Sequence, residues 1–344
     1  MDLSEAQRLW EPVGPYLNTA SYGLPPTPAF EALHSVLADW RHGATSWEPW
    51  AEATEGARRV FARLVGVPTE HIAVSATVSE LIGLVAASLP DGARVVVPDI
   101  EFTSLLFPFL AHAGRGVEVV TVAADRLVDA IDPTVTMVAF SAVQSATGEV
   151  ADVESIAAAA RQHGVLTAVD ATQACGWLPL DAARFDFLAC GAYKWLMSPR
   201  GTAFLAVAPE HLATMRPLAA GWYAGDDPHT SYYGPPLRLA ETARRFDTSP
   251  AWFSWVGTEP ALELIERIGV PAIQAHNVAL ANRFRAGLGL PAADSAIVSA
   301  QVPDAQHRLE RAGIRAAVRA GGLRVSFHVY NTEADVDAAL EALS

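Results

Sequence analysis

The sequence predicts an α/β fold in which a mostly parallel central sheet is covered by helices on both faces. Short runs rich in Val, Ala and Leu alternate with segments whose apolar residues recur at helical spacing, and Gly and Pro bound the runs. The composition agrees, because 51% of the 344 residues are hydrophobic and only 18% are charged. Such a chain can bury one large core or two domains of ordinary size.

The first half of the chain repeats the order of helix, turn and strand. Apolar residues recur at helical spacing over 48–64, residues 68–71 interrupt the pattern, and an apolar run follows at 72–75. The same reasoning predicts strands at 94–98, 117–122 and 137–141, with a helix over 102–113.

The middle of the chain places two charged residues at strand ends. An Ala-rich helix over 156–163 is ended by Gly164, and the strand at 166–169 leads directly into Asp170. Strands at 187–190 and 203–207 flank Lys194. Because ligands of parallel sheets gather at the carboxyl ends of the strands, this region is the candidate site.

The last third begins with an aromatic segment of little periodicity, which we interpret as a long functional loop over 218–255. The segment carries the aromatic residues Trp222, Tyr223, Tyr232, Tyr233, Trp252, Phe253 and Trp255. All of these except Phe253 are expected either to form an aromatic wall of a pocket or to pack at a dimer interface. A helix over 259–288, a strand at 323–327 and a helix over 333–343 then predict a smaller C-terminal α/β domain.

Charge and cysteine content exclude several classes of function. The net charge of −14 disfavours a nucleic-acid partner and favours a small molecule. The two cysteines, Cys175 and Cys190, lie in apolar stretches and predict neither a disulfide framework nor a metal site. We expect a cytoplasmic protein, because no basic-then-apolar leader and no apolar run of membrane length is present.

Asp170 and Lys194 together suggest pyridoxal 5′-phosphate (PLP) chemistry. The pyridine nitrogen of PLP stays protonated beside a carboxylate, and a lysine amine forms an imine with the cofactor and later moves protons. Each residue also has an ordinary explanation, since Asp after a strand often caps a helix and a single Lys is usually solvated.

The stretch VDATQACG…DFLACGAYKWLMSPRG resembles the signature of class V aminotransferases and cysteine desulfurases, which are fold-type I PLP enzymes. The resemblance extends from Tyr16 to the segment Leu323-Arg-Val-Ser. It implies a PLP-dependent transferase fold with a large PLP-binding domain over 21–255 and a small domain formed by 1–20 and 256–344.

The resemblance also implies roles for residues around the cofactor ring. Lys194 would form the Schiff base, Asp170 would face the pyridine nitrogen, and Gln173 would donate a hydrogen bond to the phenolic oxygen. Tyr193 stands where desulfurases carry His, and it would reach the phosphate or simply pack. Phe102 aligns with the residue that stacks on the ring, although Phe at a helix start is usually core.

Phosphate binding is expected at Thr77-Val78-Ser79, between a predicted strand and helix. A helix N-terminus offers unpaired N–H groups and a positive dipole end to an anion, although Ser79 could merely cap the helix. The resemblance further implies that Arg324 binds the substrate α-carboxylate and that Ser249 reaches the phosphate of a neighbouring subunit. It therefore implies a homodimer with active sites at the interface.

The reaction is expected to be class V aminotransferase chemistry on the α-amino group of an amino acid. The alternatives are a C–S (β-elimination) lyase, an epimerase, or an inactive PLP-binding scaffold, because the core residues do not separate these reactions. Persulfide-type cysteine desulfuration is disfavoured, since no Cys lies between Lys194 and Arg324. Ser145 stands where many relatives carry Asn near the phenolic oxygen, which leaves the tuning of the ring open.

Overall fold

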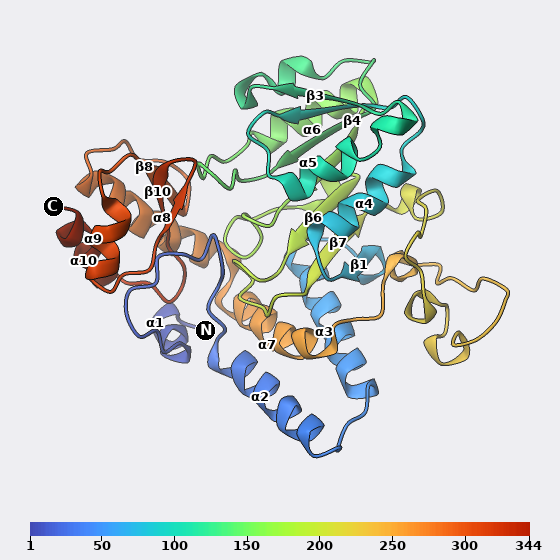
Figure 1. The fold of residues 1–344 in the computed structure, drawn as a ribbon, viewed down its shortest axis with the longest axis horizontal. Helices are drawn as coiled ribbons and strands as arrows, with labels where there is room; N and C mark the ends of the chain where they lie inside the picture. Colours follow the sequence, from blue (N-terminus) through green and yellow to red (C-terminus); the bar gives the residue numbers. More distant parts are fainter.

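The computed structural model describes residues 1–344. Figure 1 shows a large sheet-containing part, with a smaller lobe of α8, α9, α10 and the short C-terminal strands at one side. No helix is both long and apolar enough to cross a membrane. The helices are α1 (Leu3–Ala6), α2 (Thr27–Arg41), α3 (Glu48–Leu64), α4 (Val78–Ser88), α5 (Thr103–Leu110), α6 (Val153–His163), α7 (Trp252–Ile268), α8 (Val270–Gly287), α9 (Ala305–Arg311) and α10 (Glu333–Leu343).

The central sheet has seven strands in the order β1-β7-β6-β5-β4-β2-β3. All strands run parallel except β7, which is antiparallel to both of its neighbours, β1 and β6. The predicted α/β fold with a mostly parallel sheet is therefore confirmed. The strands are β1 (Ile72–Ser75), β2 (Arg94–Pro98), β3 (Glu118–Val122), β4 (Met137–Ser141), β5 (Leu166–Asp170), β6 (Phe187–Gly191) and β7 (Ala203–Val207).

Helices cover both faces of this sheet because side chains alternate along buried strands. Val138 and Phe140 of β4 lie in one core cluster with Phe61 of α3. Met137 of β4 lies in the other cluster, with Phe109 of α5. Alternate residues of each apolar run thus pack into two separate hydrophobic layers, one on each face of the sheet.

The small lobe has its own sheet and core. Its strands β8 (Ile297–Ala300), β9 (Ala317–Arg319) and β10 (Gly322–Ser326) pair antiparallel in the order β8-β10-β9. The N-terminal segment joins this lobe, since the Leu17 N–H donates to Arg315 O and Leu17 O accepts from the Ser326 N–H. The two-domain division stays a prediction, and its boundary at residue 255 falls within α7.

Two expectations about the last third are wrong. The helix expected over 259–288 is two helices, α7 and α8, separated at Gly269, whose φ of 92° breaks the helical path. The aromatic loop ends earlier than expected, because α7 starts at Trp252. Trp255 is buried on that helix and packs edge-on against Phe204, with ring centroids 5.2 Å apart.

The loop before α7 is held to the large part by a buried ion pair. Arg58 of α3 donates to Asp247 Oδ2 at 2.5 Å, and the same carboxylate accepts from the Val74 N–H at 2.8 Å. Both charged side chains are almost fully buried. Because Asp247 raises the pKa of Arg58, the guanidinium stays charged and fastens the loop to α3 and β1.

Candidate active site

A cavity of about 120 Å³ lies at the carboxyl ends of β4, β5 and β6, where the sequence placed the candidate site. It brings together all the predicted cofactor residues except Ser249. The lining residues are Ala76, Thr77, Val78, Ser79, Phe102, Ser104, Ser141, Ser145, Asp170, Thr172, Gln173, Gly191, Tyr193, Lys194, Arg200 and Thr202.

Lys194 is a buried amine in the turn that follows β6. Its side chain is 6% exposed, and Nζ lies 5.5 Å from the centroid of the Phe102 ring. Burial lowers the pKa of Lys194, Asp170 opposes this shift and the charge of Arg324 adds to it, and together they bring the pKa to about 8. A substantial fraction of the amine is therefore neutral near pH 7.5.

Asp170 ends β5 and presents a buried carboxylate to the same cavity. Its Oδ1 accepts from the Thr172 N–H at 2.8 Å, and Thr172 Oγ1 in turn accepts from the Gly191 N–H at 2.9 Å. Burial raises the pKa of Asp170, whereas the Thr172 hydrogen bonds and the charge of Lys194 oppose that rise. A cation next to this carboxylate would be stabilised by it.

The N-terminus of α4 forms the opposite wall. Thr77 and Glu80 make a capping box, in which Thr77 Oγ1 accepts from the Glu80 N–H and Glu80 Oε2 accepts from the Thr77 N–H. The Val78 and Ser79 N–H groups precede the first intrahelical donor and stay available. Two free N–H groups at a helix N-terminus make a binding site for an anion such as phosphate.

Gln173 is held on all sides by the protein. Its Nε2 donates to Ala20 O at 2.9 Å and to Ser145 Oγ at 3.1 Å, while Oε1 accepts from the indole of Trp195 at 2.8 Å. Both amide hydrogens are engaged within the chain. The expected hydrogen bond from Gln173 to the phenolic oxygen of PLP stays a prediction, and Ser145, which accepts from Gln173, lines the same cavity.

Phe102 starts α5 with 44% of its surface exposed, so it is not a core residue of this chain. Its N–H donates to the buried carboxylate of Glu101 at 2.8 Å. Glu101 also accepts from the Ser141 N–H at 2.8 Å and from Gln144 Nε2 at 3.1 Å. These bonds fix the Phe102 backbone against the end of β4, although burial raises the pKa of Glu101.

Tyr193 lines the cavity beside Arg200, whose guanidinium carbon lies 4.9 Å from the centroid of the tyrosine ring. This distance is that of a cation–π contact. The two residues place one aromatic face and one positive charge at the mouth of the cavity.

Arg324 on β10 does not line the cavity itself but donates a hydrogen bond to Ser145, which does. Nη1 donates to Ser145 O at 2.5 Å, and Nη2 donates to Ser21 Oγ at 2.7 Å. The side chain is only 2% exposed, forms no ion pair, and leaves a buried Nε without a partner. Burial accordingly lowers the pKa of Arg324 to about 10. A buried guanidinium without a counter-ion is a ready receptor for a carboxylate.

Two sequence-based expectations fall outside this cavity. Ser249 is exposed on the loop before α7, and its proposed contact with a partner subunit stays a prediction. No aromatic residue of the loop lines the cavity either. Instead Trp222 packs on Trp47, with ring centroids 5.1 Å apart, and Tyr223 packs edge-on against Trp252.

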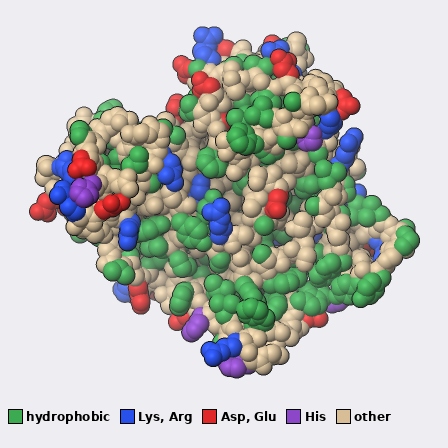
Figure 2. Space-filling model, in the orientation of Figure 1, with side chains coloured by type: hydrophobic (Ala, Val, Ile, Leu, Met, Phe, Trp, Pro, Cys, Tyr) green, Lys and Arg blue, Asp and Glu red, His purple; other side chains and the backbone are tan.

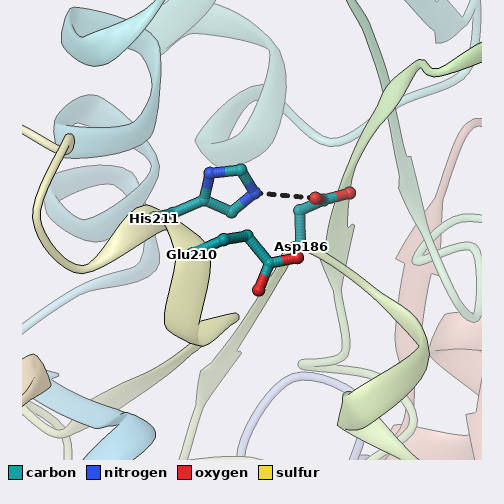
Figure 3. A group of neighbouring side chains, drawn as sticks. All are labelled: Asp186, Glu210 and His211. Atoms are coloured by element: carbon teal, nitrogen blue, oxygen red, sulfur yellow. Dashed lines mark hydrogen bonds and ion pairs between the residues drawn. The ribbon is translucent and has the colours of Figure 1, made fainter.

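A larger cavity of about 670 Å³ lies at the opposite edge of the sheet, and it holds no comparable chemistry. At its rim Asp186, Glu210 and His211 gather just before β6 and in the turn after β7 (Figure 3). The Asp186 carboxylate pairs with His211 Nε2 at 2.7 Å and accepts from the Thr167 N–H and hydroxyl. This group joins β5, β6 and the following turn.

Several functional residues were missed by the sequence reasoning. Thr172 and Arg200 stand inside the quoted signature stretches, and Ser21 and Glu101 stand in other stretches that resemble the family, but none of the four received a role. Their contacts appear only in the fold. One signal in the composition was also overlooked. Lys194 is the only lysine of the chain, beside 23 arginines.

The donor set fits PLP. It offers a buried amine, a buried carboxylate, a helix N-terminus with free N–H groups, and an exposed aromatic ring beside the amine. These are the partners that an aldehyde, a pyridinium nitrogen, a phosphate and a planar ring require.

Comparisons with known proteins agree with this geometry. The profile of the family "Aminotransferase class-V" matches residues 41–293. The "Uncharacterized aminotransferase YcbU" of Bacillus subtilis is 28% identical over 339 residues, covering 92% of this chain and 90% of that protein. Isopenicillin N epimerase of Streptomyces clavuligerus is 28% identical over 399 residues, covering 99% and 96%.

The fold has close counterparts among solved structures. The cystine C–S lyase C-DES, in complex with its product cysteine persulfide, superposes with a TM-score of 0.86 over 95% of this chain and 96% of that chain, at 23% identity. The family match, the confirmed fold and the donor set lead to one conclusion. The chain belongs to the class-V aminotransferase family and is an enzyme whose cofactor is PLP.

Proposed function

We propose that this enzyme is an aminotransferase that binds an amino acid by its α-carboxylate and takes its α-amino group. The observation that carries the proposal is one cavity that holds both the Lys194 amine and the Asp170 carboxylate. Arg324, which forms no ion pair, donates a hydrogen bond to Ser145 of the cavity lining. PLP, when bound, supplies the electron sink for the bonds at the substrate α-carbon.

Lys194 holds the cofactor and moves the α-proton. Its Nζ is the only side-chain amine of the chain, and the pKa of about 8 leaves it partly neutral, as an attacking amine and a general base must be. The Phe102 ring 5.5 Å away limits where the amine can move. Lys194 thus serves both attachment and proton transfer.

The other cofactor contacts follow from the same cavity. The Val78 and Ser79 N–H groups would bind the phosphate, and Tyr193 with Arg200 stands at the mouth. Asp170 would face the ring nitrogen and keep it protonated. Ser145 Oγ accepts from Gln173 and Arg324, so its own hydrogen is left to donate to the phenolic oxygen.

A C–S lyase is the second candidate, because a solved structure of the same fold is described as a cystine C–S lyase. A persulfide-relay desulfurase is disfavoured on the structure of this chain. Both cysteines are free and buried, with 4% of Cys175 and 0% of Cys190 exposed, and burial raises the pKa of Cys190. A neutral buried thiol is a poor sulfur carrier.

The test is incubation of the PLP-loaded enzyme with a panel of amino acids, with and without an α-keto acid. An aminotransferase consumes the keto acid and releases the keto acid of the donor. Pyruvate and ammonia released without an acceptor identify a lyase, and loss of optical activity alone identifies an epimerase. Borohydride reduction followed by peptide mapping locates the cofactor on Lys194.

Lys194→Ala is the matched control, because no other lysine can substitute for it. It should leave a folded protein in which borohydride reduction with PLP labels no peptide except, at most, the N-terminal one. A wild-type protein that stays colourless with added PLP, or a Lys194→Ala protein of unchanged activity, would instead support a scaffold without catalysis.

A homodimer is part of this proposal. Large apolar side chains are exposed on α2 and on the loop before α7, among them Phe30, Trp40, Tyr233 and Leu237. Figure 2 shows hydrophobic side chains gathered along the part of the surface where these segments lie in Figure 1. Light scattering on the purified enzyme measures the mass, and a monomer would remove the expected role of Ser249 across an interface.

A further inference from the structure

Two arginines of the small lobe converge on one hydroxyl beside the active site. Arg324 Nη2 donates to Ser21 Oγ at 2.7 Å, and Arg319 Nη2 donates to the same oxygen at 3.3 Å. Arg319 ends β9 and pairs with Gly322, two residues before Arg324 on β10. Because side chains two apart on a strand share a face, the two arginines are diagonal neighbours on one face of the hairpin.

No carboxylate of the chain is paired with either of these two positively charged guanidinium groups. The charge of Arg319 lowers the pKa of both Arg324 and Lys194. Arg324 is 2% exposed with an unpartnered buried Nε, whereas Arg319 is exposed. One cation therefore lies at the inner side of Ser21 and the other at the solvent side.

The cavity adds a third arginine and almost no negative charge. Arg200 lines its mouth above Tyr193, and none of its side-chain nitrogens has a hydrogen-bond partner. Asp170, at the inner end of the cavity, is the single acidic lining residue. A substrate that enters from solvent thus passes positive charge before it reaches Lys194.

We propose that the substrate is an acidic amino acid with a second carboxylate on its side chain. Arg324 binds the α-carboxylate, and Arg319, assisted by Arg200, binds the side-chain carboxylate. The inference rests on the proposed function, because it takes the Arg324 role as given. Guanidinium groups bind carboxylates through paired, charge-assisted hydrogen bonds, so two separate arginines select for two separate carboxylates.

The test compares acid and amide ligands of nearly equal shape. The α-methyl derivatives of L-glutamate, L-glutamine, L-aspartate and L-asparagine lack the α-proton, so they bind the PLP-loaded enzyme without turning over. Calorimetric titration measures their affinities. The wild type should bind at least one acid about tenfold or more tightly than its amide, as a charge-assisted pair provides.

Arg319→Gln should remove this preference. The affinity for the acid should fall about tenfold, while the affinity for the amide stays within about threefold. Arg319→Lys should keep part of the preference. Arg311→Gln is the matched control, because Arg311 is an exposed arginine of the same lobe without a side-chain partner, and it should change neither affinity.

Equal weakening of acid and amide by Arg319→Gln would overturn the inference, since Arg319 would then serve the α-carboxylate. Wild-type enzyme that binds acid and amide equally would overturn it as well. In both cases the proposed function survives. If none of the four ligands binds the wild type, the inference falls. The proposed function then depends on the panel of amino acids, since turnover of a non-acidic amino acid with a keto acid would keep it, and no turnover of any amino acid would remove it.

Discussion

The reactivity of Lys194 should depend on pH as the reactivity of a buried amine does. Burial lowers its pKa from the ordinary lysine value of 10.5 to about 8. At pH 7.5 an ordinary lysine is neutral in about 0.1% of molecules, whereas a lysine of pKa about 8 is neutral in about a quarter. Lys194 of the cofactor-free protein should therefore react roughly two hundred times faster at this pH than an ordinary lysine of equal access.

The assay is pulse labelling of the cofactor-free protein with acetic anhydride, followed by peptide mass spectrometry. Because Lys194 is the only lysine, the single competing amine is the N-terminus, which serves as the internal reference. The labelling rate should rise with pH, with a midpoint near 8, and level off above about pH 9. A midpoint at 10 or higher would refute the reasoning that burial controls this amine.

Charge variants test the sign of the two electrostatic contributions. The carboxylate of Asp170 stabilises the ammonium form, so Asp170→Asn should move the midpoint of Lys194 to lower pH. Arg324 repels the ammonium form, so Arg324→Gln should move the midpoint to higher pH. Shifts in the same direction for both variants would show that changes in access, rather than charge, dominate the rate.

Three further perturbations have expected outcomes. Arg324→Ala should weaken amino-acid binding about a hundredfold and leave PLP retention unchanged, which spectral titration measures; equal loss of both would contradict its assignment to the substrate. Arg58→Met should lower the free energy of unfolding by about 3–5 kcal/mol in urea, because it leaves the buried Asp247 unpaired. The double variant with Asp247→Leu should recover much of that loss, and failure to do so would point to packing instead. Gly23→Ala should impair PLP retention more than overall stability, because a Cβ there would overlap the carbonyl oxygen of Lys194; retention equal to wild type would show that the turn can move freely.

The sequence by itself determined the layers and the main chemistry. The strands β4 and β5 are visible in the sequence as short apolar runs, and α3 and α6 are visible as apolar residues at helical spacing. Both signals are local, so they do not depend on the rest of the chain. Residues that follow such strands must lie at one edge of the sheet. For this reason the sequence alone predicts that Asp170 and Lys194 lie together.

The aromatic segment before α7 shows why composition alone misleads. Its rings were expected to form a wall of the pocket or an interface. The pocket alternative is wrong, because no ring of the segment lines the cavity, Trp255 faces the core on a helix and Trp222 packs against Trp47 of a distant segment. The interface alternative stays a prediction. Composition records that rings are present, but only the path of the chain decides what they face. The break at Gly269 was missed for a related reason, since the apolar pattern continues through it.

Contacts between distant segments were decided by the tertiary structure alone. Ser21, Ser145 and Arg324 are joined by hydrogen bonds across more than half the chain, and nothing local in the sequence encodes these pairings. Likewise, the lowered pKa of Lys194 arises from burial and from charges brought in by other elements. Periodicity and strand ends are local properties that a sequence carries, whereas desolvation and the convergence of charges exist only once the chain has folded.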